Sequence, residues 1–155
     1  MDVGDKAPDF EAVDQHGQRV TLSVLLEDGP VVLFFYPKAM TSGCTKESCH
    51  FRDLAGEFAE LGAQRIGISV DSVDRQARFD AANDLGYPLL SDPDRSIAAT
   101  FGTKRFGILG TRRITFVIDT DRTILGEIRS ETRMQEHADV ALRVLRESRG
   151  TDGPS

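Results

Sequence analysis

One run of six apolar residues constrains the fold of this 155-residue chain more than any other feature. Residues 31–36 read Val-Val-Leu-Phe-Phe-Tyr, with apolar side chains on both alternating faces. A strand of this kind fits the middle of a sheet that is covered on both sides. It is far shorter than the roughly twenty residues that a membrane-spanning helix needs. The run therefore predicts a buried central strand and no contact with a membrane.

The segments around this strand alternate between strand and helix patterns. We expect an N-terminal hairpin between Asp9 and Leu22, with a turn at residues 14–17. Further strands are expected at 66–70, 88–91, 114–118 and 123–128, and helices at 43–61, 72–86, 94–101 and 132–148. Parallel βαβ units followed by an antiparallel pair and a final helix predict a mixed sheet between two helical layers, a three-layer α/β sandwich. We expect one domain over residues 1–148 and a flexible tail over 149–155.

Composition and charge narrow the possible functions. A formal net charge of −6 provides no field that attracts nucleic-acid phosphates. The first residues lack a basic segment followed by an apolar stretch, so we expect a cytoplasmic protein. The sequence shows no continuous exposed apolar stripe that would predict an interface, so we expect a monomer. Two cysteines are too few for a disulfide scaffold, which leaves catalytic, redox-sensing or metal-binding thiols.

Cys44 follows the central strand and lies in the predicted first turn of the next helix. Unpaired N–H groups and the helix dipole favour a thiolate there. A thiol with the reference pKa is only about 3% ionised at pH 7, so a fast thiol enzyme needs further groups that stabilise charge. Thr41 in the same loop and Arg113 at the start of a later strand are the candidates. The alternatives are a buried filler for Cys44, a turn former for Thr41 and a solvated strand end for Arg113.

The histidines do not suggest a metal site. Cys44, Cys49 and His50 lack the spacing of zinc ligands, and His16 and His137 are isolated in the sequence. His50 adjoins Cys49, but a cation near a helix N-terminus is disfavoured, so we interpret it as a surface residue.

Two segments resemble the peroxiredoxin family. The pattern Pro37-x-x-x-Thr41-x-x-Cys44 resembles its peroxidatic motif, and the segment starting at Arg113, Arg-Ile-Thr-Phe-Val-Ile-Asp, resembles the one that carries its active-site arginine. The longer stretch FFYPKAMTSGCTKESCHFRD is similar to the bacterioferritin-comigratory, or Q-type, subfamily, in which a second cysteine follows the first by five residues. Ser42 departs from this pattern, where the subfamily often has proline. The similarity extends from about Val3 to Arg146.

This resemblance implies a thioredoxin-like fold and reduction of hydrogen peroxide or organic hydroperoxides. It implies that the Cys44 thiolate attacks the peroxide and becomes a sulfenic acid, which Cys49 resolves as a disulfide. Thr41 and Arg113 would position the peroxide, and Pro37 would shield the site from water. Thioredoxin or a similar dithiol carrier would complete the cycle, without a metal or an organic cofactor. Phe106, in a glycine-rich loop, is a candidate contact for a larger hydroperoxide.

The spacing of the cysteines also predicts a movement. Five residues along an α-helix separate two Cα atoms by about 8.7 Å, whereas a disulfide tolerates at most about 7 Å. On a helical wheel Cys44 lies beside Phe51 on the apolar face, and Cys49 lies beside Asp53 on the polar face. Disulfide formation therefore requires the first turns to unwind. We expect the Cys44 sulfur at the mouth of the fold, beside a guanidinium.

Two other functions remain open from the residues. A thiol-disulfide oxidoreductase or redox carrier would share the fold class, although such proteins usually use C-x-x-C rather than the C-x-x-x-x-C found here. A non-catalytic interaction domain with inert cysteines is the other alternative.

Overall fold

Strand β3 (Val31–Phe35) lies inside a sheet of seven strands that the described residues form, as the apolar run predicts. The computed structural model describes residues 1–103 and 111–152, with side chains to residue 148. Strand β3 pairs in parallel with β4 (Gln64–Ser69) and antiparallel with β6 (Ile114–Ile118). All five of its residues are buried. The expected central strand, buried on both faces of a sheet between two helical layers, is confirmed.

The other strands complete a mixed sheet in the order β2-β1-β5-β4-β3-β6-β7. They are β1 (Glu11–Val13), β2 (Arg19–Thr21), β5 (Leu89–Ser91) and β7 (Ile124–Arg129). Strand β5 runs parallel to β4, whereas β1 and β2 form the expected N-terminal hairpin at one edge. Asp14 shapes its turn, because its Oδ1 accepts hydrogen bonds from the backbone N–H groups of His16 and Gln18.

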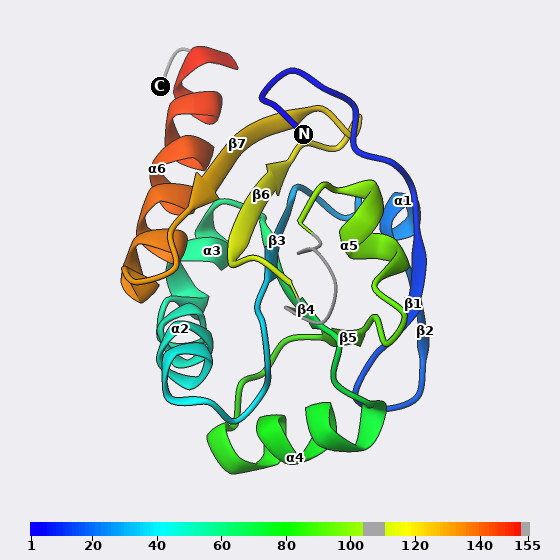
Figure 1. The fold of residues 1–155 in the computed structure, drawn as a ribbon. Coiled ribbons are helices and arrows are strands. Elements are labelled where there is room, and N and C mark those ends of the chain that lie inside the picture. The colour runs from blue at the N-terminus through cyan, green and yellow to red at the C-terminus, as the bar shows by residue number, and fades with distance from the viewer. Residues whose placement is uncertain (104–110, 153–155) are drawn as a thin grey trace.

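Helices cover both faces of the sheet (Figure 1). They are α1 (Leu22–Leu25), α2 (Ser42–Asp53), α3 (Ala55–Glu60), α4 (Val73–Asn83), α5 (Ser96–Thr100) and α6 (Met134–Asp152). Val32 and Phe34 of β3 pack into one core cluster with residues of α2, α3, α4 and α6. Leu33 and Phe35 pack into the other cluster, with residues of α1 and α5. This alternation buries apolar side chains on both faces and stabilises all three layers.

The helices differ from the predicted ranges in three places. The single helix expected over 43–61 is interrupted at Leu54, because the Arg65 side chain donates a 3.0 Å hydrogen bond to the Phe51 carbonyl that would otherwise accept from Ala55. Helix α1 was not expected; Asp9 stabilises its start by accepting hydrogen bonds from the N–H and hydroxyl of Ser23. Helix α6 ends at Asp152, beyond the expected residue 148.

Two further predictions concern a membrane-spanning helix and the position of Phe106. Among the described helices, none combines the length and the apolar character that crossing a membrane requires. Phe106 lies outside the described residues.

Candidate active site

The site lies where β3 ends and α2 begins. Residues 37–41 connect the two elements, and α2 starts at Ser42, which places Cys44 in its first turn as predicted. Asp71, which follows β4, secures this loop by accepting a 2.6 Å hydrogen bond from the Ala39 N–H. Arg75 of α4 binds the other carboxylate oxygen of Asp71 at 3.0 Å. The loop is therefore anchored to the neighbouring strand and helix. Sequence reasoning missed both anchors.

Cys44 and Arg113 are brought together by the pairing of β3 with β6. The Arg113 Nη2 lies 3.2 Å from the Cys44 Sγ, although 69 residues separate them in the chain. Arg113 is 6% exposed and Cys44 has no exposed surface. The expectation of a sulfur at the mouth of the fold is wrong, because Cys44 packs into the core cluster beneath α2 and α6. The expected guanidinium is present, and it stabilises negative charge on the sulfur.

Glu47 holds the same guanidinium from the opposite end. Its Oε1 accepts a 2.8 Å hydrogen bond from Arg113 Nη1, and the carboxylate has no exposed surface. Burial raises the pKa of Glu47 to about 8, against the opposing effect of Arg113. Burial lowers the pKa of Arg113, but Glu47 and Cys44 outweigh this effect and the net direction is upward. Our sequence analysis missed Glu47, although its position three residues after Cys44 puts both on one helix face.

His137 of α6 lies behind Glu47. Its Nδ1 is 3.5 Å from Glu47 Oε2 and 2.7 Å from the Thr115 hydroxyl, and its Nε2 is 2.8 Å from the Ser130 carbonyl oxygen. Burial lowers the pKa of His137, and Arg113 lowers it further, which favours the neutral ring. The sequence showed an isolated histidine; only the packing of α6 against β6 reveals its partners.

Thr41 and Pro37 lie in the loop that precedes the helix of Cys44. The Thr41 hydroxyl donates a 2.8 Å hydrogen bond to the Lys38 carbonyl, so its own lone pairs remain available to a donor. Pro37 is half-buried directly after the central strand. Thr41 thus also fulfils its alternative role as a turn former.

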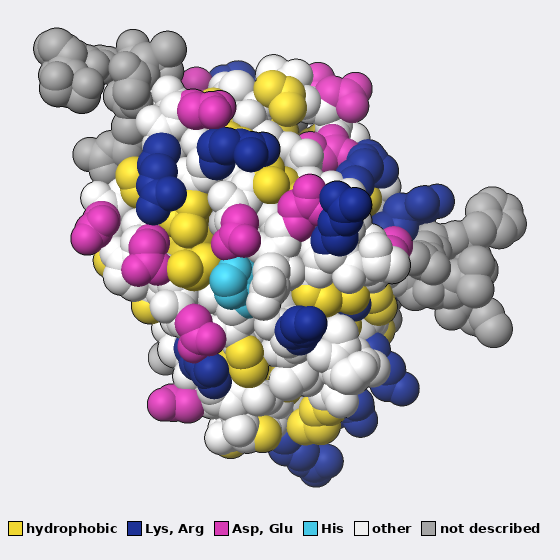
Figure 2. All heavy atoms as spheres, turned by 90° about the vertical axis from the view of Figure 1, so that its left-hand side faces the viewer, with side chains coloured by type: hydrophobic (Ala, Val, Ile, Leu, Met, Phe, Trp, Pro, Cys, Tyr) yellow, Lys and Arg dark blue, Asp and Glu magenta, His cyan; other side chains and the backbone are white. Residues whose placement is uncertain are grey.

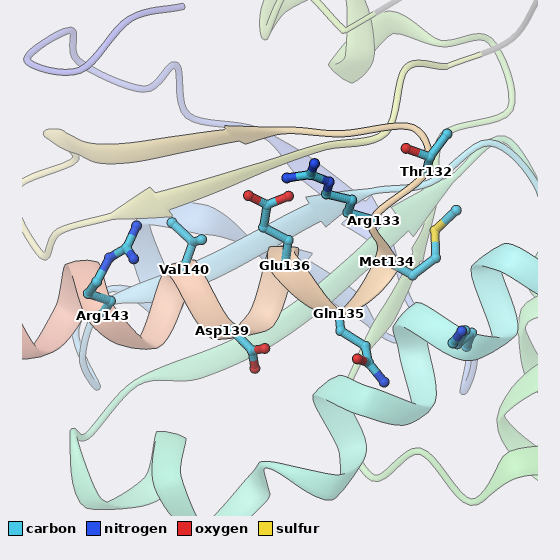
Figure 3. Close-up of a pocket in the computed structure, with 9 residues that line it drawn as sticks. Thr132, Arg133, Met134, Gln135, Glu136, Asp139, Val140 and Arg143 are labelled. Carbon is cyan, nitrogen blue, oxygen red and sulfur yellow. The ribbon is translucent and has the colours of Figure 1, made fainter.

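Gly43 has no side chain, and this allows Met134 and Arg113 to approach the first turn of α2 closely. A Cβ atom at this position would lie 3.0 Å from the Met134 Cε and 3.4 Å from the Arg113 Nη2. Met134 belongs to a groove of about 520 Å³ beside the start of α6 (Figure 3). Gln135 and Asp139 point from α6 toward α2 in this view, and Lys46 of α2 completes the wall. The groove is open, and most of the side chains that line it are polar or charged.

Cys49 lies farther along α2 in a different environment. Its Sγ is half-buried and lies 3.5 Å from the Asn83 Oδ1 of α4. The hydroxyl of Tyr87 donates a 2.7 Å hydrogen bond to the carbonyl of Ser48, which precedes Cys49. His50 is half-buried at the surface, and its Nε2 lies 2.7 Å from Asp139 Oδ1 of α6. Both cysteines are free thiols within one continuous helix.

These residues suit thiol chemistry rather than metal binding. Among residues 1–103 and 111–152, no three His, Cys, Asp or Glu side chains gather closely enough to hold a metal ion. A buried sulfur beside a fixed cation can instead be held as a thiolate, and a second thiol lies five residues away on the same helix.

Comparison with known proteins agrees with this chemistry. Residues 3–126 match the AhpC/TSA family. Peroxiredoxin Bcp from Bacillus subtilis is 39% identical over 153 residues, which cover 95% of this chain and 96% of that protein. The crystal structure of peroxidoxin BcpB from Mycobacterium tuberculosis superposes with a TM-score of 0.92 at 57% identity, covering 95% of this chain and 97% of the other.

A second solved structure is more distant in sequence. The bacterioferritin comigratory protein of Xanthomonas campestris, whose structures were described with its alkyl peroxide reduction activity, has a TM-score of 0.85 at 29% identity. The match covers 95% of this chain and 99% of that one. The thioredoxin-like fold expected from the resemblance is thereby confirmed. The chain belongs to the AhpC/TSA family and is a peroxiredoxin of the Bcp type.

Proposed function

We propose that the protein reduces hydrogen peroxide and organic hydroperoxides with Cys44 as the nucleophile. The contact of 3.2 Å between Arg113 Nη2 and Cys44 Sγ carries this proposal, because it stabilises the thiolate in the resting protein. The thiolate attacks one peroxide oxygen, the O–O bond breaks, and the leaving oxygen takes up a proton as water or alcohol. Cys44 becomes a sulfenic acid.

Thr41, Arg113 and Pro37 support this step. Because the Thr41 hydroxyl already donates to Lys38, it accepts a hydrogen bond from the peroxide O–H. Arg113 stabilises the charge that develops on the leaving oxygen. Pro37 adds no N–H group and excludes water from one side of the sulfur. Alkyl peroxide reduction by the related Xanthomonas protein supports organic hydroperoxides as a substrate class.

Cys49 resolves the sulfenic acid. Its thiol attacks the Cys44 sulfur, a disulfide forms, and the sulfenic hydroxyl leaves as water. The two thiols occupy one helix at a spacing of about 8.7 Å between Cα atoms, so α2 must unwind before the bond closes. A dithiol carrier such as thioredoxin then reduces the disulfide and becomes oxidised itself. We place the cycle in the cytoplasm, where thiols are returned to their reduced form.

A monomer is sufficient for this cycle, and both thiols come from one chain. The large hydrophobic side chains exposed on the described surface are Val3, Val24 and Met40, from three different parts of the chain. On the face that α2 and α6 present, basic, acidic and hydrophobic side chains are interspersed (Figure 2). This pattern supports a monomer.

Stopped-flow peroxide reduction by the wild type and two cysteine variants tests the proposal. We expect Cys44→Ser to consume no peroxide, and Cys49→Ser to consume one equivalent and then stop. Mass spectrometry should find the disulfide in the wild type alone. Turnover by Cys44→Ser would refute the assignment. Insulin reduction, measured in parallel, tests disulfide exchange as the competing activity, for which we expect no turnover.

A further inference from the structure

Two ionisable side chains behind Arg113 are fully buried, and the reaction above gives His137 no role. Glu47 and His137 both have no exposed surface. One carboxylate oxygen of Glu47 is bonded to Arg113, but the other, Oε2, has no hydrogen-bond partner and lies 3.5 Å from His137 Nδ1. An unpaired buried carboxylate oxygen is costly, so this gap requires an explanation.

The hydrogen bonds of the ring determine which nitrogen carries a proton. Because a carbonyl oxygen only accepts, His137 Nε2 must donate to Ser130. In the neutral ring, Nδ1 is then an acceptor, and its single lone pair receives a hydrogen bond from either the Thr115 hydroxyl or a protonated Glu47. Glu47 Oε2 and His137 Nδ1 would be two facing acceptors if the carboxylate were ionised as well. One additional proton between these two atoms removes the conflict.

The charges around the sulfur also favour a proton between Glu47 and His137. Arg113 carries one positive charge, whereas a Cys44 thiolate and an ionised Glu47 together carry two negative charges in a buried space. A net buried charge is strongly disfavoured. We propose that His137 is a positioning residue, which shares a proton with Glu47 and thereby leaves the positive charge of Arg113 to the Cys44 thiolate. This inference rests on the proposed function of Cys44.

The electrostatic surroundings agree with this geometry. Burial raises the pKa of Glu47 and lowers that of His137, so the shared proton resides mainly on Glu47 and points to the ring. The ionisable groups that interact with the pair are Arg113 at the start of β6, Glu131 before α6, Glu136 in the first turn of α6, and Tyr87 before β5. Glu131 accepts from the Arg113 backbone N–H and opposes ionisation of Glu47.

Two substitutions of His137 provide a matched test in a Cys49→Ser background. His137→Gln keeps a donor for the Ser130 carbonyl but removes the acceptor beside Glu47. His137→Asn keeps an acceptor at the position of Nδ1. The rate of Cys44 alkylation by iodoacetamide is measured against pH, with mass spectrometry to assign the site. We expect His137→Gln to raise the midpoint of this curve by about one pH unit and His137→Asn to leave it near that of the parent.

Equal shifts in both variants, or a shift in neither, would overturn the proposal, since a purely structural role changes rates without separating the midpoints. If either variant does not fold, the wild type decides: in an NMR titration the His137 ring nitrogens should respond at the same pH as the carboxyl carbon of Glu47. Titration of Glu47 without a response of the His137 ring would also overturn the proposal. Neither measurement uses peroxide, so the outcome is independent of whether the protein turns over peroxides.

Discussion

Cys44 and Cys49 lie on one helix of twelve residues and meet opposite surroundings. Cys44 has no exposed surface and touches a guanidinium that is itself held by a buried carboxylate. Cys49 is half-buried, packs against the edge of the core cluster and lies 3.5 Å from the neutral amide of Asn83. The first half of α2 is thus built around fixed charge, whereas the second half is held by hydrogen bonds to its neighbours and by the buried Phe51. In the proposed cycle, we expect the first half to perform the chemistry and the helix to open when the disulfide forms.

Three hydrogen bonds join the second half of α2 to its neighbours. Tyr87 binds the carbonyl of Ser48, and Arg65 binds that of Phe51. Arg52 of α2 donates a 2.7 Å hydrogen bond to the Asn83 carbonyl. Each such contact contributes about 1 kcal/mol to folding stability, whereas the fully buried Phe51, stacked on Phe34 at 4.2 Å, ties the end of the helix to the core.

The largest expected effect concerns the charged half. Arg113→Ala should slow peroxide attack on Cys44 about 100-fold, because charge on the leaving oxygen loses its stabilising partner. Stopped-flow measurement with hydrogen peroxide checks this. Arg112→Ala, which changes the exposed neighbouring cation, is the matched control and should retain the wild-type rate.

Removing Arg113 also leaves Glu47 buried without its cation. The double variant Arg113→Ala/Glu47→Gln replaces that buried carboxyl group by a neutral amide, and thermal unfolding reports whether the fold is restored. A slow but stable double variant would support the role of Arg113. Peroxide attack at the wild-type rate in either variant would contradict the role of Arg113 in the reaction.

The next effect concerns release of the helix. On oxidation to the disulfide, amide hydrogens across residues 41–51 should exchange at least about tenfold faster, since the bond cannot close on an intact helix. Hydrogen exchange with mass spectrometry compares the reduced and oxidised protein. Helix α4 provides the internal reference and should keep its protection. Equal protection of residues 41–51 in both redox states would contradict the unwinding.

A smaller effect is expected from one tether of the second half. Tyr87→Phe removes the hydroxyl that binds the Ser48 carbonyl and should lower the free energy of unfolding by about 1 kcal/mol. It should also speed disulfide formation in a single-turnover experiment, because α2 opens more easily. Tyr36→Phe serves as the control: its hydroxyl binds Gln76 of α4, so disulfide formation should keep its rate. A lower free energy of unfolding without faster disulfide formation would mean that this hydrogen bond does not limit the opening of α2.

The smallest effect is expected at His50. Its contact with Asp139 lies at the surface, where the Asp139 side chain is 59% exposed, and such pairs contribute little. His50→Gln should therefore change Cys44 oxidation and disulfide formation by less than about twofold. Slower turnover with unchanged Cys44 oxidation would instead assign His50 to the resolving step.

The sequence predicted those features that depend on local patterns. The apolar run at 31–36 required a strand buried on both faces, and β3 has this position. The interruption at Leu54 was not predictable, because its cause is a side chain from β4, Arg65. Helix α1 escaped prediction for a similar reason, since it depends on Asp9 binding Ser23 across a turn of the chain.

The site shows the same division. The position of Cys44 in a first helical turn followed from the strand-to-helix order, and its contact with Arg113 followed from the family resemblance. Burial of the sulfur, by contrast, depends on how α2 and α6 pack together. The association of Glu47 with His137 requires α2 and α6 to meet, which no spacing along the chain encodes.

A sulfur with no exposed surface has a kinetic consequence. An oxidant diffusing in water cannot strike it until neighbouring side chains, such as Met134 above Gly43, move aside. The frequency with which these side chains move aside sets an upper limit on the rate at which any peroxide can react. Large oxidants need larger openings, which occur less often, so the packing around one atom filters reagents by size before chemistry begins.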